Sequence, residues 1–402
     1  MFQLLLAVIY LAFISLGLPD SLIGAGWPVM HEQLGVPVAY AGIITMVISV
    51  GTIVSSLLSD RLTRALGAGL VTTISVAMTA AALLGFSVSG SFWMLCLWAL
   101  PYGLGAGAVD AALNNYVALH YASRHMNWLH SFWGVGASIS PFIMSFALTH
   151  NLGWEGGYRT VGYIQIAITV VLILSLPLWK KPSRNSNEVT STESPDPKPT
   201  DGAPIKLKEA LKIRGVKQML IAFLAYCAFE SSSTIWSSTY LVQQREVMPA
   251  TAAAFASLYL LGITAGRFLS GFVSDRLGDR QMIRIGLTTA GLGYLLIALP
   301  LPFDTLALAG LVIAGFGSAP VYPAIIHATP VNFGRDNSQA IIGIQMAAAY
   351  TGTALFPPLY GVLSQWIGMW LFPFFLLFLV ALGLVMSHCL NVIVDQRDGN
   401  RA

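Results

Sequence analysis

The sequence predicts an all-α membrane protein, with twelve transmembrane helices in two pseudo-symmetric bundles of six. Of its 402 residues, 55% are hydrophobic and only 10% are charged, and the mean hydropathy is +0.70. Soluble domains carry about 25% charged residues, and a chain of this length cannot bury so much apolar surface in one water-soluble core. The composition therefore excludes a large soluble protein and indicates one that crosses the membrane many times.

Twelve apolar segments are long enough to cross a bilayer, which requires about 20 mostly apolar residues in a helix. They run approximately over residues 3–30, 38–58, 68–90, 92–119, 128–150, 158–179, 214–242, 251–273, 282–302, 304–327, 338–363 and 367–390. Lipid offers no hydrogen-bond partners to the backbone, so each segment is predicted to be a helix. No Lys or Arg precedes Arg61, and we expect the first segment to be a retained span rather than a signal peptide.

Basic residues gather in alternate loops and predict the orientation in the membrane. Arg61 and Arg64 follow the second segment, Arg124 follows the fourth, and a run of Lys and Arg follows the sixth. The opposite set of loops holds little beyond Arg159 and Arg245. The positive-inside rule therefore predicts that both termini are cytoplasmic. The expected location is a bacterial cytoplasmic (inner) membrane.

The long loop after the sixth segment is predicted to join two domains. It is rich in Pro, Ser, Thr and charge, which is typical of a flexible linker. The expected organisation is an N-terminal bundle over 1–180, a cytoplasmic linker over 181–213, a C-terminal bundle over 214–394 and a cytoplasmic tail over 395–402. Near the end of the linker, KLKEALKIR is either a short amphipathic helix on the membrane surface or a solvated hinge.

The two halves of the sequence repeat each other. SDRL occurs at 59–62 and again at 274–277, and GASISP at 136–141 is echoed by GTALFP at 352–357. GLGAGAVDAA, from Gly103, resembles GFGSAPVYPA, from Gly315. These matches keep the same order and nearly the same spacing, so they predict six spans followed by six spans of one design. Transporters built from such repeats bind their substrate near the membrane midplane, between the halves.

The second SDRL copy lies in a longer pattern. GRFLSGFVSDRLGDR, at 266–280, resembles the signature loop of the major facilitator superfamily, whose pattern is matched by Gly271, Asp275, Arg276, Gly278 and Arg280. The first copy is degenerate but keeps Asp60 and Arg61. With twelve spans and a central loop, the resemblance covers nearly the whole chain. It implies the fold of that superfamily and a cytoplasmic gate formed by these residues, in which an Asp accepts hydrogen bonds from a helix N-terminus and pairs with an Arg. Arg267, eight residues before Asp275 on the same helix face, is expected to join the gate.

Within the superfamily, three stretches resemble the fucose-permease-like sugar/proton symporters. The first segment places Asp20 where that group has an intramembrane acid, and GLGAGAVDAALNNYVA places Asp110 and Asn114 at its acid and Asn positions. In WLHSFWGVG, His130 and Trp133 replace an amide pair. The resemblance implies proton-coupled transport of a small polar solute such as a sugar, by alternating access.

Four strongly ionisable residues lie deep within the spans: Asp20, Asp110, Glu230 and Arg267. Such a residue costs about 2.5 to 3.5 kcal/mol at a helix centre on insertion scales, so function is the default hypothesis. Burial favours the neutral form of a carboxyl group, which suits a group that must take up and release a proton. Asp20 and Asp110 are therefore the predicted proton-coupling residues, with structural ion pairing as the alternative.

Other polar and aromatic side chains are candidates for binding the solute. Amides and carboxylates bind hydroxyl groups, and an aromatic ring packs on the apolar face of a sugar. The predicted substrate-binding residues are Trp27, Asn114, Asn115, His130, Trp133, Glu230, Gln345 and Tyr350. For the Trp residues the alternative is an anchoring or packing role, and for His130 a structural hydrogen bond. His120 and His327 lie near helix ends and are interpreted as structural.

The sequence offers little support for other classes of protein. Its three cysteines, Cys96, Cys227 and Cys389, lie in apolar segments and predict neither disulfides nor a metal site. We find no phosphate-binding loop, catalytic triad or nucleic-acid patch, so an enzyme, a cofactor and a nucleic-acid partner are not expected. The expected partners are a small-molecule substrate, the lipid bilayer and a coupling proton or sodium ion, for a monomer. The alternatives are a proton-driven exporter of drugs or amphipathic metabolites and a non-transporting membrane receptor.

Overall fold

The computed structural model describes residues 2–37, 40–179, 207–300 and 304–399, and in them the chain is almost entirely helical. Twelve helical stretches are long and apolar enough to cross a membrane, which confirms the predicted number of spans. The first half contains α1 (Phe2–Gly17), α2 (Leu22–Gln33), α3 (Ala41–Leu66), α4 (Ala68–Ser87), α5 (Phe92–His120), α6 (Ser123–Thr149), α7 (Gly153–Ser175) and the 3-10 turn η2 (Leu176–Trp179). The second half contains α8 (Leu207–Ala210), α9 (Val216–Arg245), α10 (Pro249–Leu277), α11 (Asp279–Ala298), α12 (Thr305–Ser318), α13 (Val321–His327), α14 (Thr329–Phe333), α15 (Arg335–Ile367), η3 (Met369–Leu371) and α16 (Phe372–Gly399).

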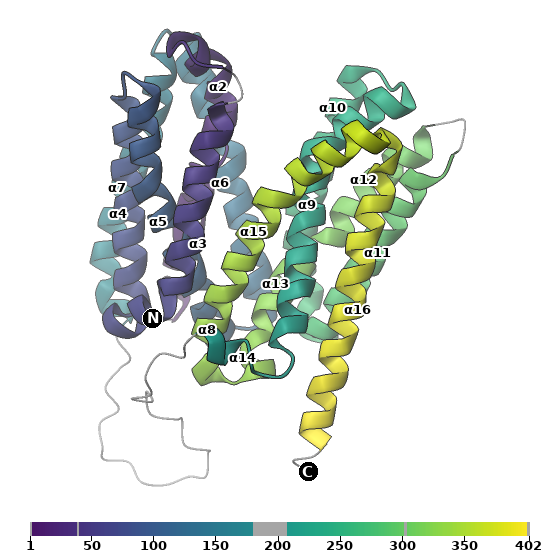
Figure 1. Cartoon of the computed structure of the whole chain (residues 1–402). Helices are drawn as coiled ribbons and strands as arrows, with labels where there is room; N and C mark the ends of the chain where they lie inside the picture. The colour runs from purple at the N-terminus through teal and green to yellow at the C-terminus, as the bar shows by residue number, and fades with distance from the viewer. Residues whose placement is uncertain (1, 38–39, 180–206, 301–303, 400–402) are drawn as a thin grey trace, which may run out of the picture.

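The helices form two bundles that meet at one end of the molecule and diverge at the other (Figure 1). Both ends of the chain lie at the end where the bundles meet. There α15 packs on α3, α10 packs on α6, and α13 packs on α5 and α6. We call this region the closed end, formed by the last turns of α3, α5, α10 and α13 and the first turns of α6, α11 and α15.

The first span is broken in the middle rather than continuous. The helix stops after Gly17, residues 18–21 form turns, and α2 starts at Leu22. Pro19 has no backbone N–H to continue the helical ladder, which explains a break at this point. Asp20 lies within the break, and its backbone N–H donates to the Gly17 carbonyl at 3.2 Å. The polar residue of this span is thus carried by irregular backbone, which membrane proteins tolerate where it lines a cavity.

Glycines let helices within each bundle approach to backbone contact. A Cβ atom added at Gly103 would lie 2.2 Å from the Ile48 carbonyl oxygen, and one at Gly107 would lie 2.1 Å from that of Thr52. In the second half, a Cβ at Gly315 would lie 2.4 Å from the Tyr259 carbonyl oxygen. The repeated GLGAG and GFGSA stretches therefore hold α5 against α3 and α12 against α10 in equivalent ways.

Both SDRL helices end at a glycine with positive φ, Gly67 at 79° and Gly278 at 76°. Thr63 replaces the later signature glycine in the first copy, and the helix there simply runs one turn further before Gly67 ends it. A left-handed backbone favours glycine, so the degenerate copy keeps the same turn at a shifted position.

Most of the predicted linker, residues 181–206, lies outside the described residues. The part that is described contains α8, a single helical turn whose Ala210 is fully buried. Leu211 and Ile213 then pack against the hydrophobic core of the protein. The end of KLKEALKIR is thus packed on the second bundle rather than free in solvent.

Candidate substrate cavity and gate

A cavity of about 660 Å³ lies between the two bundles and is lined by residues of both. Its ionisable and aromatic polar lining includes Asp20, Tyr102, Asp110, His130, Trp133, Glu230, Arg267, Tyr322 and Tyr350. Phe13, Leu16, Ile23 and Leu260 are among its apolar lining. A concave site with an apolar wall and a few convergent polar groups is the usual form of a small-molecule site.

Asp20 faces the cavity and is held by two donors from neighbouring helices. The Tyr102 hydroxyl on α5 donates to Oδ1 at 2.8 Å, and the Trp133 indole N–H on α6 donates to Oδ2 at 2.9 Å. The side chain itself is exposed in the helix break, so a solute or water can reach it. The cavity thus brings together Asp20 and Trp133, two of the predicted site residues, and adds Tyr102, which lies eight residues before Asp110 on α5.

Asp110 is only 4% exposed and forms the centre of a hydrogen-bonded chain. The Asn114 side-chain amide donates to its Oδ1 at 2.8 Å, and His130 Nε2 lies 3.1 Å from Oδ1 of Asn114. The amide of Asn114 gives its N–H to Asp110, so His130 must donate through Nε2. The Tyr350 hydroxyl on α15 reaches Asp110 Oδ2 at 3.0 Å and links the second bundle to the first.

Glu230 and Arg267 form an ion pair in the second bundle, with 3.1 Å between Oε1 and Nη2. The Arg267 side chain is almost fully buried, and its guanidinium group lies 5.8 Å from the centre of the Tyr322 ring. Both residues line the cavity. The expectation that Arg267 joins the gate is wrong, because eight helical residues place it about 12 Å along α10 from Asp275, at the depth of Glu230.

Four predicted substrate-binding residues are absent from the cavity lining: Trp27, Asn114, Asn115 and Gln345. Of these, Asn114 hydrogen-bonds to the lining residues Asp110 and His130. Trp27 is buried on α2, where its ring lies beside that of His31. Asn115 accepts a hydrogen bond of 2.6 Å from Ser338 at the closed end. Gln345 is fully buried and bonds with Thr329 at 3.1 Å inside the second bundle.

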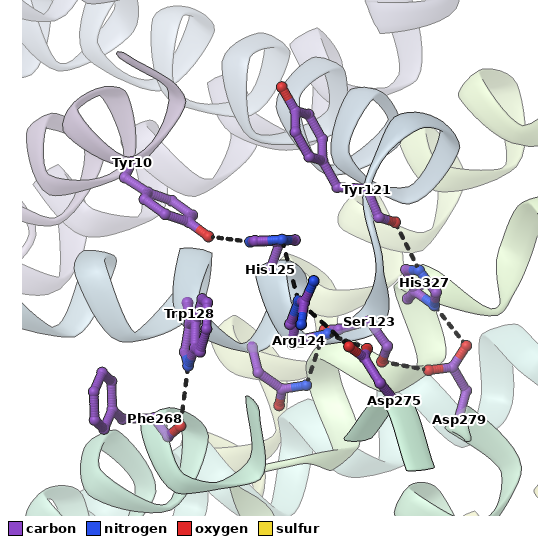
Figure 2. A network of polar contacts seen from close by, with 11 residues as sticks. Tyr10, Tyr121, Ser123, Arg124, His125, Trp128, Phe268, Asp275, Asp279 and His327 are labelled. Atoms are coloured by element: carbon purple, nitrogen blue, oxygen red, sulfur yellow. Dashed lines mark hydrogen bonds and ion pairs between the residues drawn. The ribbon is translucent and has the colours of Figure 1, made fainter. Parts of the chain in front are cut away.

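The signature loop of the second half contacts the first half at the closed end (Figure 2). Asp275 Oδ1 accepts the backbone N–H of Arg124 at 3.1 Å, and its Oδ2 lies 3.4 Å from Arg124 Nε. Arg124 is the second residue of α6, so Asp275 meets both a helix N-terminus and an arginine. This is the arrangement expected of the gate, with the partner helix supplied by the other bundle.

Gly271 allows a second contact between the two bundles at the closed end. A Cβ atom added there would lie 2.3 Å from Nε1 of Trp128 on α6. That nitrogen donates to the Phe268 carbonyl at 3.2 Å (Figure 2). Arg280, by contrast, pairs with Asp395 at 2.5 Å and so links α11 with α16 inside the second bundle.

The first signature copy is organised differently. Asp60 pairs with Arg64 of its own helix at 2.9 Å, and Arg64 Nη2 donates to the Asp336 carbonyl at the start of α15 at 3.2 Å. Arg61 and Arg276 are exposed, and no hydrogen bond or ion pair joins either of them to another described residue. Arg64, which was not among the predicted gate residues, is therefore the arginine of the first copy that contacts the second bundle.

His327, the last residue of α13, belongs to the same end of the molecule (Figure 2). Its Nδ1 lies 2.7 Å from Asp279 Oδ2, and its Nε2 lies 3.2 Å from the Tyr121 carbonyl oxygen. Asp279 Oδ1 in turn accepts a hydrogen bond of 2.7 Å from Ser123. The sequence interpretation treated His327 as structural, and only the placement of Tyr121 and Ser123 beside it indicates a contact between bundles.

A family profile described as Major Facilitator Superfamily matches residues 9–255 and 218–399. The chain belongs to this superfamily. An uncharacterized MFS-type transporter of Yersinia pestis is 23% identical over 366 residues, which cover 88% of each chain. The protein is thus an integral membrane transporter rather than an enzyme.

Two solved structures are similar over nearly the whole chain. One is the MFS transporter FucP in the outward conformation, with a TM-score of 0.76, 16% identity, and 95% of this chain and 97% of FucP covered. The other is a second structure of the Escherichia coli fucose:proton symporter FucP, with a TM-score of 0.74, 17% identity, and coverage of 96% and 97%. Identities this low establish the common fold of twelve helices in two bundles.

Proposed function

We propose that this transporter couples the movement of protons to the uptake of a small polar solute of the sugar class. The observation that carries the proposal is that Asp20 and Asp110 line the same cavity between the bundles. The names of the similar structures, which include a fucose:proton symporter, support the same solute and coupling ion. Asp20 and Asp110 are the coupling residues in this proposal.

The surroundings of the two acids suit different roles. Asp20 is exposed to the cavity, and its oxygens can accept hydrogen bonds from solute hydroxyl groups. Asp110 is buried and holds Tyr350 of the other bundle, so its protonation changes a contact that must break when the bundles rearrange. A proton on Asp110 replaces a charged hydrogen-bond acceptor by a neutral one and thereby weakens that contact.

The charge of the cavity favours a neutral solute over an anion. The lining contains three carboxylates, on Asp20, Asp110 and Glu230, against one guanidinium group, on Arg267. That guanidinium group is already paired with Glu230. A carboxylate or phosphate on the solute would meet excess negative charge, so we expect neutral hexoses to compete for uptake and hexuronates of the same size to fail.

The orientation in the membrane is part of the proposal. The basic loops and both chain termini share the closed end, which the positive-inside rule assigns to the cytoplasm. The cavity then opens to the outside, as in the similar FucP structure of the outward conformation.

The test is uptake into proteoliposomes from a panel of neutral sugars, under an imposed pH gradient or an imposed sodium gradient. We expect accumulation with the pH gradient alone, and we expect Asp20→Asn and Asp110→Asn to lower it at least about tenfold, the effect of a single charged hydrogen bond. Asp304→Asn is the matched control, since Asp304 is half exposed and does not line the cavity. Retained accumulation in both cavity variants would refute the coupling assignment.

A proton-driven exporter of amphipathic molecules is the second candidate, and the apolar part of the cavity lining favours it. Phe13, Leu16, Ile23 and Leu260 could bind the apolar side of such a molecule. Outward movement of hydrophobic cations in the same vesicles, without uptake of any sugar, would decide for the exporter.

A further inference from the structure

The ring of His327 lies between two hydrogen-bond acceptors. Nδ1 faces a carboxylate oxygen of Asp279 at 2.7 Å, and Nε2 faces the backbone oxygen of Tyr121 at 3.2 Å. A backbone oxygen never donates, so Nε2 must carry a hydrogen for this contact to be favourable. Between Nδ1 and Asp279 a further hydrogen is needed, whichever of the two atoms holds it. The pair therefore holds one proton more than a neutral imidazole beside a carboxylate.

The partners of this pair come from both bundles. His327 and Asp279 belong to α13 and α11 of the second bundle, whereas Tyr121 and Ser123 flank the start of α6 in the first. The His327 and Asp279 side chains are only 17% and 14% exposed, so water replaces these contacts poorly while the closed end is formed. Losing the extra proton leaves two lone pairs facing each other, either at Tyr121 or at Asp279.

The other ionisable groups near His327 do not change the need of the His327–Asp279 pair for an extra proton. Asp279 on α11 and Asp275 on α10 are the charges that act on His327, and both are acidic. On α6, Arg124 is paired with Asp275, and His125 accepts from Arg124 Nε at 3.4 Å, so His125 is satisfied as a neutral ring. The α5 residue His120 bonds to the Tyr116 carbonyl of its own helix at 2.8 Å. The helices α12 and α14 contain no charged residue, and α9 faces α13 through Phe223 and Tyr226.

We propose that His327 and Asp279 form a proton-dependent clasp that joins the bundles at the closed end. With the proton bound, Nε2 of His327 donates to Tyr121 and the closed end is held together. When the proton leaves, the charged Asp279 keeps the remaining ring hydrogen because it is the stronger acceptor. The contact with Tyr121 is then lost, and the closed end opens more easily. The compartment that the closed end faces then sets the conformational equilibrium by its pH, with acid favouring the closed form. The proposal rests on the alternating access of the proposed function, but not on its solute or on the cavity acids.

The experiment measures the closed end directly, without solute or gradient. Spin labels at Leu66 and Gln281, which are exposed on opposite sides of the closed end, report its separation in lipid nanodiscs. The labelled positions are introduced as cysteines in a full-length chain whose Cys96, Cys227 and Cys389 are replaced by alanine. From pH 5 to pH 8 we expect the ratio of closed to open molecules to fall by roughly tenfold, the effect of one charge-assisted hydrogen bond.

Variants separate the clasp from other titrating groups. His327→Gln should open the closed end and remove most of the pH dependence of the ratio of closed to open molecules. His327→Lys keeps a fixed charge and should make that ratio independent of pH. It also serves as the test if the Gln variant fails to fold. His120→Gln is the matched control and should behave like the parent protein. An unchanged pH response in His327→Gln, or none in the parent, would overturn the clasp.

The cavity acids need a separate comparison, because they also bind protons. If the response survives in Asp110→Asn and disappears in His327→Gln, it belongs to the clasp. The opposite result would assign the response to the cavity and overturn the clasp, while leaving proton coupling by Asp110 intact. Retained uptake in Asp20→Asn and Asp110→Asn, without any change in the pH response, would contradict only the proposed function.

Discussion

At the residue scale, Asp20 and Asp110 have the same side chain but different surroundings. Asp20 lies in a helix break and is exposed to the cavity, whereas Asp110 lies in the middle of α5 and is 4% exposed. Among the described residues, Asp20 receives side-chain hydrogen bonds only from its own bundle, and Asp110 also receives one from Tyr350 of the other. Protonation of Asp110, but not of Asp20, therefore changes a hydrogen bond between the two bundles.

Replacing Tyr350 by Phe tests that role of Asp110. The change removes the hydroxyl that bonds to Asp110 and keeps the ring, and a hydrogen bond to a charged group contributes about 1.5 to 3 kcal/mol. We expect pH-driven uptake to fall about tenfold or more. Tyr360→Phe is the control, because its hydroxyl bonds to the Met369 carbonyl within the second bundle. Equal uptake by the two variants would show that the Asp110–Tyr350 contact has no part in coupling.

At the element scale, several polar contacts between the bundles at the closed end are made by helix ends. Asp275 at the end of α10 meets the start of α6, and Arg64 at the end of α3 meets the start of α15. The two copies of the signature loop thus contact the pseudo-symmetric helices α6 and α15 through different atoms. Asp275 contacts the helix N-terminus itself, whereas Asp60 acts through Arg64.

Asp275→Ala should accordingly open the closed end more than Asp60→Ala does. The first change removes both the acceptor of a backbone N–H and the partner of Arg124, and the second leaves the Arg64 side chain in place. Surface ion pairs alone are worth about 0 to 1 kcal/mol, so most of the difference comes from the helix N-terminus. The spin-label separation described above measures it, and a larger effect of Asp60→Ala would contradict the assignment.

The close approach of α15 to α3 makes a second prediction at this scale. A Cβ atom at Gly343 would lie 2.4 Å from the Ser56 carbonyl oxygen of the opposite bundle. Gly343→Ala should therefore prevent full closure without unfolding either bundle. Gly42→Ala is the matched control, because a Cβ there meets nothing within 4 Å. A normal closed separation in Gly343→Ala would show that the interface tolerates the shift.

At the scale of the whole molecule, the contacts between bundles at the closed end must break for the cavity to open on that side. Asn115 and Ser338 contact each other there across the two bundles at 2.6 Å. A disulfide between Asn115→Cys and Ser338→Cys should stop transport, and a reducing agent should restore it. The pair Ser15→Cys and Gln165→Cys is the control, because that contact joins α1 and α7 within one bundle. Transport that continues through the oxidised Asn115–Ser338 pair would rule out alternating access by relative motion of the bundles.

The fold was predictable from the sequence to a large extent, because hydropathy and repeated motifs are local properties. The twelve spans follow from stretches of apolar residues, and two bundles of six follow from the repeated SDRL and glycine-rich stretches. The cavity was predictable in part. A carboxylate within a span is costly wherever it lies, so Asp20, Asp110 and Glu230 stand out without knowledge of the fold.

The tertiary structure decided which of these residues meet. Trp27 lies outside the cavity lining, and the depth of Arg267 on α10 pairs it with Glu230 instead of the gate. The contacts of Asp110 with Tyr350 and of His327 with Tyr121 join residues more than 200 positions apart. Such contacts depend on the rotation and depth of each helix in the packed bundles. A sequence pattern records the composition of one helix face, but not which face of another helix lies opposite it.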